Sequence, residues 1–570
     1  MTQPSDDPRS EEVSRGDRVS GRPWASRSPV VAQHGMAATA HPVATRVAVD
    51  VLRQGGNAVD AAIAANAALG FLEPVGCGIG GDLFALVWDP NSEEVVGLNA
   101  SGRAPIGRSY GTLREKLDGA KRIPPFGSLS VTVPGAVSGW FALHERFGKR
   151  SMDELLQPAI ELAREGSPLP QTIAYYWRRN IQALKRFAAS EPWLEELDNA
   201  LGTFAPGGRV PGVGEVFANP DLARTYERIA SGGRAAFYQG VIAKTVDGYM
   251  RRIGGDLRLA DFQRHTSEWV KPLSVLYRGV RVYELPPNTQ GVAALQMLAI
   301  LNGFDLGGMT PGSAELIHLQ VEAKRLAFED RARFYSDPAA KANIPDLLSD
   351  QRIVKMRELI RPNQVILNLP VDESVLEEGD TTYLTVADGS GMMVSLIQSN
   401  YRGMGSGLVP DGLGFMLQDR GELFALDPDH SNVYAPGKRP FHTIIPAMAT
   451  RNGKAWLSFG VMGGAMQPQG HVQVLSHLVD FGMNVQEAGD AARWRHDGSP
   501  EPTGAPGDGV GVLYVESGIS PTARDALRRK GHQVRDGAGG FGGYQAILRD
   551  DNAVYHGASE MRKDGLALGY

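Results

Sequence analysis

The pattern of the chain changes at Gly379, where a long helical section gives way to strands. Two β-rich runs, TTYLTVAD (381–388) and MMVSLIQS (392–399), are separated by Gly389-Ser390-Gly391, which predicts a β-hairpin. The preceding section, 138–370, is mainly helical with Gly and Pro breaks. Helices and strands both contribute, so we expect an α/β or α+β fold rather than an all-α or all-β one.

Four further elements can be read from local sequence. Asn57 is a suitable N-cap for an Ala-rich helix over 58–69, and the apolar run 83–88 reads as a buried strand. A strand over 455–459 runs into a glycine-rich turn, and helical spacing of apolar residues follows from Pro468.

Composition narrows the class of partner. The 570 residues are 42% hydrophobic and 21% charged, which is typical of a globular protein. The net charge is −6 and no long basic run occurs, so we expect neither nucleic acid nor an anionic membrane as partner, but a small molecule. The sequence contains no run of about 18 apolar residues, so we expect no membrane-spanning helix.

The N-terminus and the cysteine content bear on location and cofactors. Residues 1–28 mix both charge signs with Ser and Pro and lack the apolar core of a signal peptide, which predicts a disordered arm and a cytoplasmic protein. Cys77 is the one cysteine, so neither an intrachain disulfide nor a Cys-based zinc site can form. We expect no metal and no cofactor.

Two features of the glycine-rich loop 76–81 resemble functional motifs, but a structural role explains each of them better. Gly76, Gly78 and Gly81 fit the G-x-G-x-x-G pattern of dinucleotide sites. That mechanism needs a strand before the glycines and a helix after them, whereas a helix precedes and a strand follows here. Cys77 has no base or cation near it in sequence, which favours a buried filler over a nucleophile.

The pair Thr381-Thr382 opens the first strand of the hairpin, directly after the acidic segment VDESVLEEGD (371–380). Ser and Thr often begin strands, so the pair alone carries little weight. Its setting changes this, because an ordered series of motifs resembles the gamma-glutamyltransferase family over nearly the whole chain. The matching motifs are Gly55–Ala62, Pro74–Asp82, Val133-Pro134-Gly135, Leu285–Gly291, Gly437–Pro440 and Met462-Gly463-Gly464.

The resemblance implies a four-layer αββα sandwich, of the α+β class, made as one precursor that cuts itself before Thr381. Residues 29–380 would form the large chain and 381–570 the small catalytic chain, associated in one globular unit. The freed α-amine of Thr381 would act as base for its own hydroxyl, since its pKa lies near working pH. The family pattern further implies that Ser399 hydrogen-bonds the nucleophile.

Gly463 and Gly464 match the oxyanion pair of the family. Glycine suits this role, because backbone N–H groups must approach the developing oxyanion without an intervening side chain.

The substrate positions depart from the family. The Asn, Gln and Asp that hold a γ-glutamyl ammonium group fall on Tyr401, Arg420 and Leu423, none of which offers a comparable acceptor. Glu422 is the neighbouring acid that could compensate.

On the carboxylate side, two serines of the family become His442 and Thr443, and the arginine of the large chain corresponds to Arg103. We expect Arg103, His442 and Thr443 to hold a carboxylate, with Arg420 as an additional clamp.

The resemblance, with these departures, implies an amidohydrolase or acyltransferase for an acidic acyl group, either γ-glutamyl or a related dicarboxylic monoamide. The second substrate type is that of the acylase and oxamate-hydrolase branches of the family, which the sequence also resembles. Two alternatives stay open: a true glutathione hydrolase, and an unprocessed binding protein without activity. A homodimer is a further arrangement that the sequence allows.

Overall fold

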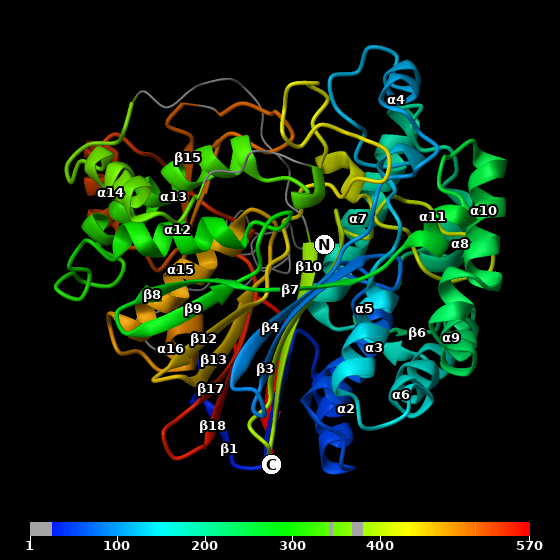
Figure 1. Ribbon diagram of the computed structural model, residues 1–570, viewed down its shortest axis with the longest axis horizontal. Coiled ribbons are helices and arrows are strands. Elements are labelled where there is room, and N and C mark those ends of the chain that lie inside the picture. Colours follow the sequence, from blue (N-terminus) through cyan, green and yellow to red (C-terminus); the bar gives the residue numbers. More distant parts are fainter. Residues whose placement is uncertain (1–24, 341–345, 368–379, 508) are drawn as a thin grey trace, which may run out of the picture.

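Two β-sheets of seven strands face each other at the centre of the molecule (Figure 1). The predicted arm lies outside the described residues except for 25–28, and so does most of the acidic segment before Thr381. The computed structural model describes residues 25–340, 346–367, 380–507 and 509–570.

Sheet I contains the predicted hairpin at its centre, and every neighbouring pair of its strands is antiparallel. Its strands, in spatial order, are β19 (Leu566–Gly569), β2 (Gly35–Thr39), β10 (Asp380–Asp388), β11 (Met393–Tyr401), β3 (Asp82–Asp89), β4 (Glu94–Ala100) and β7 (Glu268–Val270).

Sheet II is also antiparallel throughout. Its strands, in spatial order, are β1 (Val30–Ala32), β18 (Tyr555–Ser559), β17 (Tyr544–Arg549), β13 (Lys454–Val461), β12 (Ala447–Arg451), β9 (Val280–Glu284) and β8 (Leu273–Tyr277).

Apolar side chains fill the space between the sheets, among them Phe84, Tyr383 and Ile397 from sheet I. The few polar groups there bond to one another: the hydroxyls of Thr385 and Ser458 lie 2.7 Å apart across the two sheets. Buried hydroxyls cost little when paired in this way. The strands are covered on both faces, which explains why β11 is buried along its whole length.

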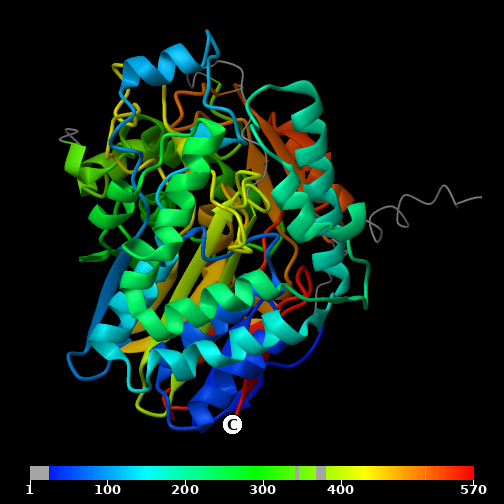
Figure 2. The ribbon, with the colours of Figure 1, turned by 90° about the vertical axis from the view of Figure 1, so that its right-hand side faces the viewer.

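Helices cover the outer face of sheet I, on the right of Figure 1 and in front of the strands in Figure 2. In α3, Asn57 caps the N-terminus as predicted, in a capping box with Asp60. All of α3 is buried, because it lies between sheet I and a second row of helices. The helices of this side are α2 (Pro42–Arg53), α3 (Ala58–Leu72), α5 (Ala136–Phe147), α6 (Met152–Glu165), α7 (Gln171–Ser190), α8 (Asp198–Phe204), α9 (Pro220–Tyr238), α10 (Val241–Ile253) and α11 (Leu259–Arg264).

A second helical layer covers sheet II and completes the αββα sandwich. It contains α12 (Gly291–Leu301), α13 (Ala314–Phe334), α14 (Asp350–Leu359), α15 (Met466–Val479), α16 (Val485–Asp490) and α17 (Pro521–Arg529). The remaining elements are α4 (Tyr110–Lys116), the small sheet of β14 (Trp494–Asp497), β15 (Val512–Val515) and β16 (Gln533–Asp536), and the pair β5 (Ser167–Pro168) and β6 (Val216–Phe217).

The antiparallel sheets with helices in outer layers confirm the α+β sandwich. The hairpin, the buried strand near 83–88 and the helix after the 460–464 turn are confirmed, with bounds within a few residues of the prediction. The prediction was incomplete for 138–370, since β7, β8 and β9 interrupt its helices and extend both sheets.

Candidate active site

Thr381 lies at the start of β10, almost fully buried at 2% exposure. Its hydroxyl donates to Ser399 Oγ over 3.4 Å, and Ser399 Oγ also accepts the N–H of Tyr401 over 2.8 Å. The glycine-rich loop before β3 packs on Thr381: a Cβ on Gly76 would lie 3.3 Å from the backbone N and C of Thr381. The loop glycines therefore allow close packing of backbone on backbone.

Contacts between the sheets show which part of β13 faces Thr381. Thr385 bonds to Ser458, and two residues further along a Cβ on Gly460 would meet the ring of Tyr383. Side chains of a strand alternate between its faces, so the next inward position after Tyr383 is Thr381. On β13, two residues beyond Gly460, the chain enters the turn that contains Gly463.

Gly463 and Gly464 form that turn with φ angles of +113° and +56°, which L side chains rarely adopt. Among the described residues, no acceptor receives the backbone N–H of either glycine. Helix α15 begins two residues later, at Met466, so its positive end faces the turn. The turn therefore presents unpaired donors at the end of the sandwich where Thr381 lies.

Asp82 lies beside Ser399 in sheet I, because its position on β3 pairs in register with that of Ser399 on β11. Its Oδ1 accepts the N–H groups of Gly102 and Gly135 at 2.9 and 3.1 Å. Its Oδ2 lies 3.0 Å from His442 Nε2, and both side chains are fully buried.

The Asp82–His442 pair titrates unusually because water is excluded. Burial raises the pKa of Asp82 to about 7, although Arg420 and the donors around the carboxylate oppose this shift. Burial, reinforced by the positive charge of Arg420, lowers the pKa of His442 well below its ordinary value. His442 is therefore a neutral imidazole at neutral pH.

Arg420 places a buried cation beside this pair. Its guanidinium stacks 4.5 Å from the ring centre of Tyr401, and Nη1 donates to Thr443 Oγ1 over 2.7 Å. Within the described part of the chain, Nε and Nη2 have no partner. Burial lowers the pKa of Arg420 to about 10, so the group remains charged at neutral pH. Within the described residues, Nε and Nη2 of Arg420 are therefore available to a bound acceptor.

The acids next to Arg420 do not neutralise it. Glu422 binds Arg402 through both carboxylate oxygens, at 2.5 and 2.6 Å. Burial, and then the charge of Glu422, raise the pKa of Asp419 well above its ordinary value. The shift favours the protonated form of Asp419 and so weakens its ability to offset the charge of Arg420. Leu423 is fully buried in the core beside sheet II.

Arg103 occupies a different environment from that of Arg420. Its guanidinium contacts Asp337 at 3.1 Å, Glu268 at 2.8 Å and the carbonyl of Gly437 at 3.3 Å. Its charge is already compensated by these two carboxylates. The structure thus brings together, through direct contacts or strand register, Thr381, Ser399, Tyr401, Arg420, His442 and Thr443. Gly463 and Gly464 lie in the turn that follows β13 of the facing sheet.

Asp82 and Gln290 belong to this group of residues but were not among the predicted site residues. A signal for Asp82 was present, since one carboxylate stands at the start of the otherwise apolar run DLFALVW. Gln290 lies in a motif that was recognised only as a family match. Its side chain donates to the carbonyls of Thr443 and Gly464.

Among the described residues, one group offers ligand atoms for a metal ion within 4.8 Å of one another: His318, Glu322 and His532. Most of its polar atoms already bond to other protein groups, and only His532 Nδ1 has no partner in the described part of the chain. His318 Nδ1 and His532 Nε2 lie at hydrogen-bond distance, 2.8 Å, and the carboxylate of Glu322 accepts from Arg325 and from the N–H of Ile366. We assign it a structural role.

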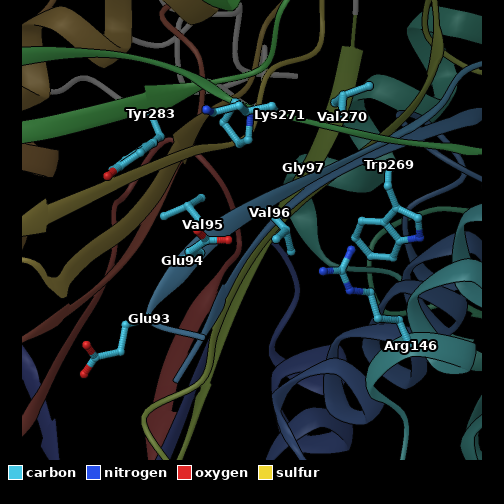
Figure 3. Close-up of a pocket in the computed structure, with 11 residues that line it drawn as sticks. Glu93, Glu94, Val95, Val96, Gly97, Arg146, Trp269, Val270, Lys271 and Tyr283 are labelled. Atoms are coloured by element: carbon cyan, nitrogen blue, oxygen red, sulfur yellow. The ribbon is translucent and has the colours of Figure 1, made fainter. Parts of the chain in front are cut away.

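A cavity of about 500 Å³ opens at the edge of the sandwich, away from these residues (Figure 3). Strands β4 and β7, the segment after β7 and Tyr283 line it, and the guanidinium of Arg146 lies 4.5 Å from the ring centre of Trp269. It contains none of the predicted site residues.

Cys77 is buried as predicted, and burial together with Glu73 raises the pKa of its thiol well above the ordinary value.

Comparisons with known proteins identify the family and the fold. A family model described as gamma-glutamyltranspeptidase matches residues 44–570. The chain is 34% identical to a glutathione hydrolase-like YwrD proenzyme of Bacillus subtilis and 32% identical to an oxamate amidohydrolase proenzyme of Klebsiella pneumoniae. In both cases the match covers 95% of this chain and 99% of the relative.

A solved structure shares the fold over the whole chain. The crystal structure of cephalosporin acylase from Bacillus halodurans matches with a TM-score of 0.87 and 39% identity, covering 100% of this chain and 99% of that one. In the described residues, no helix has the length and apolar character needed to cross a membrane.

Proposed function

The chain belongs to the gamma-glutamyltranspeptidase family of self-processing amidohydrolases, and from that premise we propose that it cleaves amides of a dicarboxylic acid through an ester on Thr381. The observation that carries the substrate class is Arg420, a buried cation stacked on Tyr401, two of whose donors have no partner among the described residues.

The precursor reaction begins at the same hydroxyl. Thr381 Oγ attacks the carbonyl carbon of the preceding peptide bond. The C–N bond then breaks, which frees the α-amine of Thr381 and leaves residue 380 as an ester on Oγ. Water hydrolyses this ester, which restores the hydroxyl and separates the two chains. In the mature enzyme this amine takes the proton of the hydroxyl as Oγ attacks the substrate amide. The C–N bond then breaks, the leaving amine receives the proton, and water hydrolyses the ester on Thr381.

Ser399 orients the nucleophile through the 3.4 Å contact between the two hydroxyls. The N–H groups of Gly463 and Gly464 stabilise the oxyanion of both tetrahedral intermediates. Their lack of acceptors within the described residues supports this role, because oxyanion donors must be unpaired before substrate binds.

Arg420 binds the distal carboxylate of the acyl group through Nε and Nη2, which match the paired oxygens of a carboxylate. Thr443 fixes Arg420 through Nη1, and neutral His442 contributes a polar edge without a competing negative charge. Arg103 is held by Asp337 and Glu268, so we propose that it supports the loop instead of gripping the substrate.

One observation favours γ-glutamyl substrates as a second candidate. Asp419 Oδ2 is buried and has no partner in the described part of the chain, so it could accept from an ammonium group. The raised pKa of Asp419 and the positive charge of Arg420 both disfavour a cation here, however, which leaves the amine-free acyl group as the first candidate.

Turnover of γ-glutamyl-p-nitroanilide and glutaryl-p-nitroanilide separates the two, because they differ only in the α-amine. We expect the higher kcat/KM for the glutaryl compound. Faster turnover of the γ-glutamyl compound would contradict the assignment and favour a glutathione hydrolase.

An unprocessed binding protein would run as a single full-length band on a denaturing gel. The cytoplasmic location and the homodimer stay predictions, which cell fractionation and light scattering can check.

A further inference from the structure

Gln290 joins two separate loops of the candidate site. It precedes α12, is fully buried, and its Nε2 donates to the carbonyls of Thr443 and Gly464 at 2.5 and 2.8 Å. Thr443 is the residue that holds Arg420, and Gly464 belongs to the turn with the unpaired N–H groups. The side-chain amide of Gln290 therefore contacts both the His442-Thr443 segment, which holds Arg420, and the Gly463-Gly464 turn.

The orientation of the Gln290 amide is fixed by its partners. Arg331 Nη1 donates to Oε1 over 2.8 Å, and a guanidinium can only donate. The nitrogen must therefore face the two carbonyls, which can only accept, and both of its hydrogens are used. No other arrangement of this side chain satisfies all three partner groups.

Arg331 is itself immobilised. It forms an ion pair with Glu501 and lies 3.7 Å above the ring of Phe328 on the same helix, α13. Its side chain is fully buried. The result is a directional chain of contacts from Glu501 through Arg331 and Gln290 to the two loops, and charge-assisted donation to Oε1 strengthens the donors on Nε2.

We infer that Gln290 is a positioning residue that holds the Gly463-Gly464 turn and the His442-Thr443 segment at a fixed separation. An acyl group whose carbonyl reaches the oxyanion donors then places its carboxylate on Arg420. This inference rests on the proposed function. Misplacement of reacting groups by about 1 Å can cost about 10²-fold in rate, so the fixed separation matters to catalysis.

The test uses the variants Gln290→Met and Gln290→Glu, assayed with glutaryl-p-nitroanilide and the uncharged valeryl-p-nitroanilide. Both changes remove the two donors, and Gln290→Glu keeps the size of the side chain and a partner for Arg331. Per cleaved enzyme, we expect kcat for the valeryl compound to fall about 10- to 100-fold. The preference for the glutaryl compound should fall as well, because Thr443 is released.

Gln296→Met is the matched control. Gln296 is equally buried on α12, and its Nε2 donates to Asp330 and to the carbonyl of Leu347, outside the candidate site. We expect this variant to lose stability but to keep kcat and substrate preference.

Folded Gln290 variants with unchanged kcat and preference would overturn the inference. Loss of folding in both Gln290 variants, with Gln296→Met folded, would overturn it too, by showing a role in the fold alone. The valeryl kcat does not depend on the carboxylate clamp, so failure of this inference is distinguishable from failure of the proposed substrate class.

Discussion

Replacing Arg420 by methionine tests the proposed clamp most directly. Methionine keeps an apolar stem against the ring of Tyr401 but removes the charge and the two unpaired donors. A hydrogen bond to a charged group contributes about 1.5–3 kcal/mol, so loss of two should cost about 3–6 kcal/mol in transition-state binding. This corresponds to a fall of about 10²- to 10⁴-fold in kcat/KM for a substrate with a distal carboxylate.

The assay is the ratio of kcat/KM for glutaryl-p-nitroanilide to that for valeryl-p-nitroanilide, which has the same acyl length without the carboxylate. A ratio cancels effects of the substitution on folding or on the nucleophile. Arg103→Met is the control, since its guanidinium is already bound by Asp337 and Glu268. An unchanged ratio in Arg420→Met, or a larger loss in Arg103→Met, would refute the reasoning.

Three further predictions follow from single contacts. Thr381→Ala should leave one band on a denaturing gel in place of fragments of 380 and 190 residues, because the attacking hydroxyl is gone; cleavage in this variant would exclude Thr381 as nucleophile. The folded state raises the pKa of Asp82 to about 7, so it binds more protons than the unfolded state between about pH 4 and pH 7. Stability from this group should therefore fall as pH rises through that window, by at most about 4 kcal/mol, and urea titrations should show a weaker fall in Asp82→Asn. Gly460→Ala would place a Cβ 2.4 Å from the ring of Tyr383 and should lower stability by about 1–3 kcal/mol in thermal unfolding, whereas Gly107→Ala, with no atom within 4 Å, should be nearly neutral.

Local sequence was sufficient to predict the hairpin that begins at Thr381 and the N-terminus of α3. The hairpin was predictable because alternating β-rich runs flank a glycine turn, and the N-cap of α3 because Asn57 supplies the side-chain acceptor directly before an Ala-rich run. Such signals depend on neighbours in the chain. They identify an element without showing what it packs against.

Strands β7, β8 and β9 could not be found in this way. They are short, and their stability comes from pairing with strands far away in the chain: β7 joins β4, and β9 joins β12. The same limit applies to Asp82. Its proximity to Ser399 depends on the register of β3 against β11, and its altered titration depends on burial that only the assembled sandwich provides.

The order of strands explains how a cut chain can remain one molecule. In sheet I, β2 from the predicted large chain lies between β19 and β10 of the predicted small chain, and β3 pairs with β11. In sheet II the two predicted chains meet at β1–β18 and at β12–β9. Separation would break all of these ladders and the apolar layer between the sheets, whereas the cut before Thr381 breaks one peptide bond at the start of β10. Because Gly76, Asp82 and Gln290 reach the nucleophile side from the large chain, the same interleaving that keeps the chains together also builds the site from both of them.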